Sequence, residues 1–221
     1  MRFINSHIFS TKQYLIFEIL VLFFLLPVLF IPLAKNNSIF LMFTLCIIAL
    51  LCIHVLIKSK LHTLKKFLFT QGLNKSTKIL VIRALILAPL LVMTLIVLNS
   101  GILFYHPKES LTVWFSLWVI YPLFSALPQE VIYRTFIFKR YKSLLPNINQ
   151  RVILSCLAFG FLHIVFRNWQ AVVLSILASI IFCNTYVKSK SVFLVTLEHS
   201  CFGLIAYTTG IGYYFDSSLI S

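Results

Sequence analysis

The chain reads PQEVIYR from Pro128 to Arg134, which places a carboxylate at Glu130 and a guanidinium at Arg134 in an otherwise apolar sequence. Residues i and i+4 lie on one face of a helix, so these two side chains are predicted to pair. Charged side chains at membrane depth are costly and usually mark functional sites. Two further polar segments follow, FGFLH at 159–163 and EHSCFG at 198–203, and the three are predicted to converge on one site.

The composition around this stretch is that of a polytopic membrane protein. Of the 221 residues, 60% are hydrophobic and 11% are charged, whereas about 25% are charged in soluble domains. Apolar runs long enough to span a membrane are predicted at 14–33, 39–57, 79–98, 111–141, 152–166, 171–187 and 192–208. The segment 61–73 is predicted to form an interfacial helix or an eighth span. The fold class is therefore an all-α polytopic helical membrane bundle of about seven to eight transmembrane helices.

The formal net charge of +14 is predicted to set the membrane topology. Basic residues lie in short connections between apolar runs, a pattern that fits lipid headgroups and the positive-inside rule rather than nucleic acid. With a cytoplasmic N-terminus, all of the 19 lysines and arginines except Lys35, Lys108 and Arg167 fall on the inner side. The chain is predicted to be integral to a bacterial inner (plasma) membrane, with the lipid bilayer as a partner and no nucleic acid partner.

The polar segments are predicted to deliver their side chains to one depth. Glu130, His163 and His199 lie nine to twelve residues from the predicted cytoplasmic ends of their helices. At ~1.5 Å per residue, all three lie roughly 13–18 Å from the cytoplasmic surface. A shared depth is what a buried hydrolytic site requires.

Hydrolysis is the chemistry that these residue types favour. The Glu130 carboxylate can take a proton from water, and the imidazoles of His163 and His199 can position that water, protonate a leaving amine or stabilise an oxyanion. Two histidines and one carboxylate are also a ligand set for zinc. Their spacing matches no HExxH-type motif, so a zinc site at Glu130, His163 and His199 and a metal-free, glutamic-type mechanism both stay open.

At these residues the chain resembles the CPBP family of intramembrane proteases, also called the type II CAAX prenyl endopeptidase or Abi family. That family carries Glu-Glu-x-x-x-Arg, then Phe-x-x-x-His, then His-x-x-x-Asn or Asp. The segment 129–134 matches the first motif with one change, 159–163 matches the second, and 199–203 matches the third up to its last position. The resemblance covers about residues 111–207.

The resemblance implies an all-helical membrane protein that cleaves a peptide bond near or within the membrane, at a site open to the cytoplasmic side. It implies that Glu130 is the second motif glutamate, that Arg134 is its structural partner and that Phe159 begins the second motif. It also implies that His163 handles water or a metal and that His199 is the imidazole on the oxyanion side.

Two positions depart from the family pattern. The first motif glutamate, generally assigned as the general base, is Gln129 here, and the final Asn or Asp is Gly203. An amide cannot take a proton from water at neutral pH, so the proton chemistry is expected to fall to Glu130. Glu198 is an additional carboxylate that could compensate if it faces the same cavity.

The sequence thus predicts an intramembrane endopeptidase that acts on a peptide or on a membrane-anchored or prenylated protein. The alternative, which Gln129 and Gly203 favour, is a non-catalytic membrane immunity or binding protein on the same scaffold. In both cases residues 1–221 are expected to form a single membrane-embedded domain, with a catalytic-like core at about 111–208.

Overall fold

The structure, a computed structural model, describes residues 11–35, 37–59, 61 and 73–216. Seven helical segments in this part of the chain are long and apolar enough to cross a membrane: Lys12–Ala34, Ile39–Lys58, Thr77–Leu98, Leu111–Arg140, Ile148–Phe166, Trp169–Ser189 and Val192–Thr209. The described residues contain no strand, which confirms the predicted all-α polytopic bundle. The predicted interfacial helix or eighth span at 61–73 lies almost entirely outside the described residues.

The helices are built from α-helical, 3-10 (η) and π-helical (η) segments that follow one another along the chain. Their bounds are α2 (Lys12–Leu20), η1 (Val21–Leu25), α3 (Leu26–Ala34), α4 (Ser38–Lys58), α6 (Leu73–Leu98), η2 (Ser100–Ile102), α7 (Tyr105–Glu109), α8 (Leu111–Tyr121), η3 (Pro122–Ala126), α9 (Leu127–Glu130), η4 (Val131–Phe136), α10 (Ile137–Arg140), α11 (Ile148–Leu162), η5 (His163–Phe166), α12 (Trp169–Ser189), α13 (Val192–Thr209) and η6 (Ile211–Phe215).

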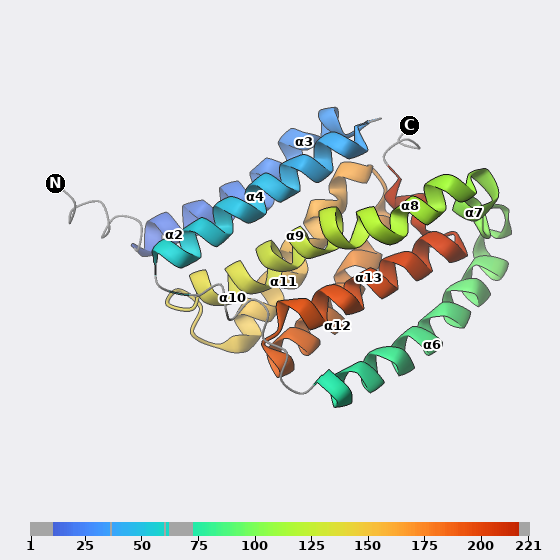
Figure 1. Cartoon of the computed structure of the whole chain (residues 1–221). Helices are drawn as coiled ribbons and strands as arrows, with labels where there is room; N and C mark the ends of the chain where they lie inside the picture. The colour runs from blue at the N-terminus through green and yellow to red at the C-terminus, as the bar shows by residue number, and fades with distance from the viewer. Residues whose placement is uncertain (1–10, 36, 60, 62–72, 217–221) are drawn as a thin grey trace.

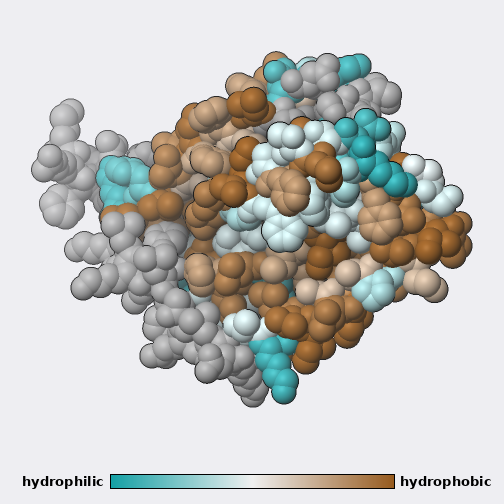
Figure 2. All heavy atoms as spheres, turned by 45° about the vertical axis from the view of Figure 1, so that its right-hand side comes forward, coloured by the Kyte–Doolittle hydropathy of each residue, from teal (hydrophilic) through white to brown (hydrophobic). Residues whose placement is uncertain are grey.

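The three C-terminal spans form the centre of the bundle. Half of the residues are buried in the most apolar stretch of α13, compared with 11% in that of α6, which packs along α13 at the edge (Figure 1). The outer helices turn large apolar side chains outward, including Val97 and Leu98 of α6. Hydrophobic residues cover much of the face shown in Figure 2. An apolar exterior of this kind matches a lipid environment, and the protein is an integral membrane protein.

The end of the bundle that holds the 141–147 loop is rich in basic residues and in polar ties between helices. Arg140 makes two hydrogen bonds of 3.0 Å to the carboxylate of Glu18, so α10 is bound to α2. Arg151 donates to the carbonyl oxygens of Phe138 and Pro146 and thereby fastens the loop to α11. Burial, with the Glu18 carboxylate nearby, raises the pKa of Tyr141. These contacts fix the end of the helix that carries Glu130 and Arg134.

The span from Leu111 to Arg140 is irregular on both sides of Glu130. π-Helical turns η3 and η4 flank the short α9, and π-helical turns often occur at functional sites. Pro128 has no N–H to offer the carbonyl of Phe124, and the Cys46 Sγ lies 3.8 Å from that carbonyl as a hydrogen-bond donor. The span is therefore irregular at Pro128. The extra residue in each π turn helps to set the direction in which Gln129, Glu130 and Arg134 point.

Candidate active site

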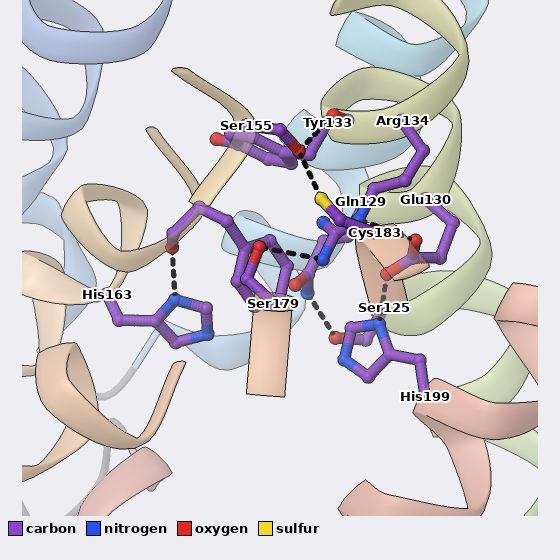
Figure 3. A network of polar contacts seen from close by, with 11 residues as sticks. Ser125, Gln129, Glu130, Tyr133, Arg134, Ser155, His163, Ser179, Cys183 and His199 are labelled. Atoms are coloured by element: carbon purple, nitrogen blue, oxygen red, sulfur yellow. Dashed lines mark hydrogen bonds and ion pairs between the residues drawn. The ribbon is translucent and has the colours of Figure 1, made fainter. Parts of the chain in front are cut away.

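Glu130 and His199 form the closest contact between the predicted site residues. The Oε1 atom of Glu130 on α9 lies 2.7 Å from Nδ1 of His199 on α13 (Figure 3). An ionised carboxylate has no proton to donate, so Nδ1–H of His199 is the donor and Nε2 carries the free lone pair. A histidine held in this way can accept a proton through Nε2.

Arg134 neutralises the same carboxylate from the other side. Its Nε atom lies 3.1 Å from Oε2 of Glu130, close enough for an ion pair although the N–H is not aligned for a hydrogen bond. Both side chains are 0% exposed. Arg134 also donates to Ser179 Oγ at 3.0 Å, and its guanidinium lies 4.4 Å from the centre of the Phe159 ring. The predicted pair is present. Because both side chains are buried, removing either one would leave a buried charge without its partner.

Aromatic rings fix the orientation of the His199 imidazole. Phe182 of α12 stacks on it with a centroid distance of 4.7 Å and an interplanar angle of 24°. Phe159 and Tyr121 meet it edge to face at 5.5 and 5.8 Å. Contacts on several sides leave the ring little freedom to rotate, so Nε2 keeps its direction.

His163 lies at the junction of α11 and η5 and faces the same space as His199. Its Nδ1 atom is 2.8 Å from the carbonyl oxygen of Phe159, which accepts the hydrogen bond, so Nε2 is again the free nitrogen. Its ring contacts the ring of Phe159, which also touches His199. Figure 3 shows His163 and His199 on opposite sides of this group of residues. The three predicted segments therefore do converge.

Gln129 points into the cavity beside the two histidines. Its Nε2 donates to Ser125 Oγ at 2.9 Å, one helical turn earlier. Its Oε1 is buried and has no hydrogen-bond partner among the described residues. A buried acceptor without a partner is costly, so this oxygen is available for a donor that enters the cavity, such as water or a peptide N–H.

The cavity has a volume of about 890 Å³ and is lined mainly by apolar side chains of α3, α4, α6, α8, α11, α12 and α13. Gln129, His163 and His199 belong to its wall, whereas Glu130 does not. From these residues the cavity extends along the bundle to Ile39 and Asp216. That end lies opposite the 141–147 loop (Figure 1). The opening on the cytoplasmic side that the resemblance implies stays a prediction.

Glu198 does not supply the carboxylate that Gln129 lacks. It forms an ion pair with Arg83 of α6, which also donates to Thr185 Oγ1 at 2.9 Å. Successive helical residues point about 100° apart, and Glu198 accordingly does not belong to the cavity wall that His199 lines. The pair instead fastens the peripheral helix α6 to α13.

Gly203, which stands where the third motif has Asn or Asp, lies against Tyr121. A Cβ atom at this position would overlap the ring and hydroxyl of Tyr121 on α8. The glycine is thus the residue that allows Tyr121 to approach α13, one turn beyond His199. Nothing in the sequence motifs pointed to Tyr121, nor to the packing residues Phe182 and Ser179, because their contacts arise only when distant helices pack.

The predicted zinc ligands do not form a metal site. Among the described residues, no group of three or more His, Cys, Asp or Glu side chains lies close enough to hold a metal ion. Glu130 is engaged by Arg134 and His199 and does not line the cavity wall that His163 and His199 share. The donor set Glu130, His163 and His199 therefore does not fit zinc.

The comparison with known protein families agrees with this geometry. Residues 110–205 match the family model described as Type II CAAX prenyl endopeptidase Rce1-like. No curated protein and no solved structure matches the chain significantly. The fold is that of a membrane-embedded helical bundle, and the matched region is similar to an intramembrane protease family. Within residues 110–205 the chain is similar to the type II CAAX prenyl endopeptidase (CPBP) family, the family that the three motifs resemble.

Proposed function

We propose that the protein is an intramembrane endopeptidase in which His199 is the general base and Glu130 orients it. The observation that supports this assignment is the 2.7 Å contact between Glu130 Oε1 and His199 Nδ1. Since the carboxylate does not line the cavity, it cannot meet a water molecule there directly. Glu130 therefore acts through the imidazole, whose Nε2 can reach the cavity. This differs from the expectation that Glu130 itself deprotonates water.

The proposed reaction is hydrolysis of one peptide bond. Water attacks the carbonyl carbon while His199 Nε2 takes its proton, so that a C–O bond forms and the carbonyl oxygen becomes an oxyanion. The tetrahedral intermediate then collapses, the C–N bond breaks, and the imidazolium returns the proton to the leaving amine. The products are a carboxylic acid and an amine, and no other reactant is needed.

Gln129 and His163 are assigned to positioning the water. The unpaired Oε1 of Gln129 and the free Nε2 of His163 are both acceptors on the cavity wall. A water that donates one hydrogen to His199 has a second hydrogen to donate to one of them. This assignment gives the amide at position 129 a task that needs no proton transfer.

The apolar cavity favours a substrate segment that resides in or on the bilayer. Apolar side chains of seven helices surround most of the space, and Gln129 and the two histidines are among the polar groups on its wall. We therefore propose a peptide or a membrane-anchored protein as the substrate, with the scissile bond beside Gln129 and the two histidines. We also propose a bacterial inner membrane and a cytoplasmic N-terminus, in line with the distribution of basic residues.

The site residues also indicate which part of the chain forms the catalytic core. Every residue assigned a role lies between Tyr121 and Gly203, within the core predicted at about 111–208. The bend at η1 packs against α11, and α4 packs against η4. We propose that residues 1–221 form one membrane-embedded domain in which the N-terminal helices complete the wall of the cavity.

A non-catalytic binding or immunity protein is the second candidate. The observation in its favour is that the group on the cavity wall at the first motif position is the amide of Gln129, while the carboxylate of Glu130 is withdrawn behind His199. Such a protein would bind a membrane peptide in the same cavity without cleaving it.

Cleavage of a pool of internally quenched apolar peptides by the purified protein in detergent micelles separates the two functions. The endopeptidase is expected to release fluorescence, and a His199→Ala variant of equal monodispersity is expected not to. If neither protein cleaves but both bind a peptide of the pool, the binding function is supported instead.

A further inference from the structure

We propose that the phenol of Tyr121 is a catalytic residue that donates a hydrogen bond to the oxyanion formed during peptide hydrolysis. The inference rests on the proposed endopeptidase function and adds to it a role that the motifs do not contain. Glu130 accepts from His199 and offers no donor, and one of the two amide N–H groups of Gln129 is used by Ser125. The reaction requires a hydrogen-bond donor, because a developing oxyanion needs donors placed in advance.

Tyr121 lies at the right place for this task. It ends α8 and belongs to the cavity wall together with Gln129, His163 and His199. Its ring meets the His199 ring nearly at right angles, with centroids 5.8 Å apart and an interplanar angle of 81°. The phenol is therefore next to the imidazole that is proposed to activate water, on the same side of the bundle as Gly203.

The hydroxyl of Tyr121 is available. It makes no hydrogen bond with any other residue in the described part of the chain, whereas a buried tyrosine hydroxyl usually finds a partner. The neighbouring Tyr207, in contrast, donates to the carbonyl oxygen of Phe215 at 3.5 Å. Tyr207 also packs against the Tyr121 ring at 5.6 Å and so holds it in position.

Gly203 supplies an independent argument. A Cβ atom there would overlap Cε1, Cζ and the hydroxyl oxygen of Tyr121, so the phenol fills the volume that a side chain at position 203 would need. Position 203 follows His199 by four residues and lies on the same helical face. The phenol from α8 thus places a polar hydrogen where a polar side chain from α13 would otherwise stand.

The proposed step leaves the phenol proton in place. As the C–O bond to water forms and the carbonyl π electrons move to oxygen, Tyr121 O–H donates to that oxygen. When the C–N bond breaks, the carbonyl forms again and the hydrogen bond weakens. His199 carries the only proton that is transferred, so the phenol is a donor of a hydrogen bond and not an acid.

The test compares kcat and KM of the wild type with those of Tyr121→Phe, using the peptide of the quenched pool that the wild type cleaves fastest. Phenylalanine keeps the ring against Gly203 and removes only the hydroxyl. Loss of one oxyanion donor is expected to lower kcat by about 10²–10³-fold with little change in KM. Tyr213→Phe, which removes a tyrosine hydroxyl outside the cavity wall, is the matched control and should leave both constants unchanged.

A second pair of variants tests whether the Tyr121 side chain contributes only packing. Tyr121→Ala opens the space beside Gly203, and adding Gly203→Asn to it returns a donor to that space from the other helix. The double variant is expected to recover at least about tenfold in kcat over Tyr121→Ala, since a correctly placed donor contributes far more than that.

The results separate this proposal from the function on which it rests. If the wild type cleaves, His199→Ala does not, and Tyr121→Phe keeps the wild-type kcat, the role of Tyr121 is overturned and the endopeptidase stands. If the wild type cleaves no peptide of the pool, both proposals fall. A loss in Tyr121→Phe that appears in KM alone also overturns the oxyanion role, because a donor to the transition state acts on kcat.

Discussion

Oε1 of Glu130 and Nδ1 of His199 lie 2.7 Å apart, although the residues are 69 positions apart in the chain. The contact joins the irregular span that begins with α8 to the last span, α13. Since Arg134 holds the other carboxylate oxygen, the carboxylate is fixed from both sides. The fixed carboxylate therefore holds the His199 imidazole in one orientation.

Glu130→Gln is expected to lower kcat by about 10²–10⁴-fold, in the range seen when an orienting carboxylate becomes an amide. The amide can donate as well as accept, so it no longer selects the His199 tautomer with a free Nε2. Steady-state cleavage of the quenched peptide measures the effect. A kcat within tenfold of the wild type, in a protein that stays monodisperse, would contradict the role of Glu130.

Arg134→Ala is expected to destabilise the fold by about 3–5 kcal/mol, because it leaves the Glu130 carboxylate buried without its cation. Thermal unfolding in micelles measures the loss. The double variant Glu130→Gln/Arg134→Ala should be less destabilised than the sum of the two single variants, since the unpaired charge is gone. Additive losses would show that the two side chains do not interact.

Glu198→Gln is expected to keep kcat within about tenfold of the wild type, whereas loss of a base costs 10²–10⁴-fold. The reason is that Glu198 faces Arg83 on α6 and not the cavity. The same variant should lower the melting temperature, as should Arg83→Met. A loss of activity with no change in melting temperature would place Glu198 in the chemistry after all.

Gln129→Glu is expected to change kcat by less than about tenfold, because His199 already supplies the base and a second one adds little. The variant places a carboxylate on the cavity wall, so its activity also tests whether the native chain is a non-catalytic binding protein. Cleavage by Gln129→Glu alone, with an inactive wild type, would show that the native chain has lost the reaction.

Removal of divalent metal ions is expected to leave the cleavage rate within about twofold of the untreated value, since the candidate donors do not form a ligand set. Glu130 is paired with Arg134 and His199 and does not line the cavity wall that the two histidines share. Cleavage after treatment with a chelator, and after addition of zinc, provides the measurement. Complete loss with chelator and recovery with zinc would refute this expectation.

Much of this site could be predicted from the sequence because membrane helices leave few places for polar residues. The pairing of Glu130 with Arg134 followed from helical spacing, and the convergence of three segments followed from depth. The sequence could not decide which way Glu198 points, since a difference of about 100° between neighbours depends on how α6 and α13 pack. It also could not show that the Glu130 carboxylate lies off the cavity wall, which is why the proposed role of His199 differs from the expectation for Glu130.

Tyr121 illustrates a second limit. Its place beside Gly203 depends on how α8, which ends just before the π-helical turn η3, approaches α13, and no sequence pattern indicates that turn. Depth arithmetic assumes regular helices and a uniform rise. It predicted that the two histidines share a level and gave no sign of the phenol beside Gly203.

The central claim is that a Glu130-oriented His199 activates water in the cavity, and the most direct test is the cleavage rate of His199→Ala. With the wild type cleaving a quenched apolar peptide in micelles, the account predicts a fall in kcat of at least about 10²-fold, the usual contribution of a general base. The melting temperature should change far less than in Arg134→Ala. Cleavage by His199→Ala at the wild-type rate would contradict the account.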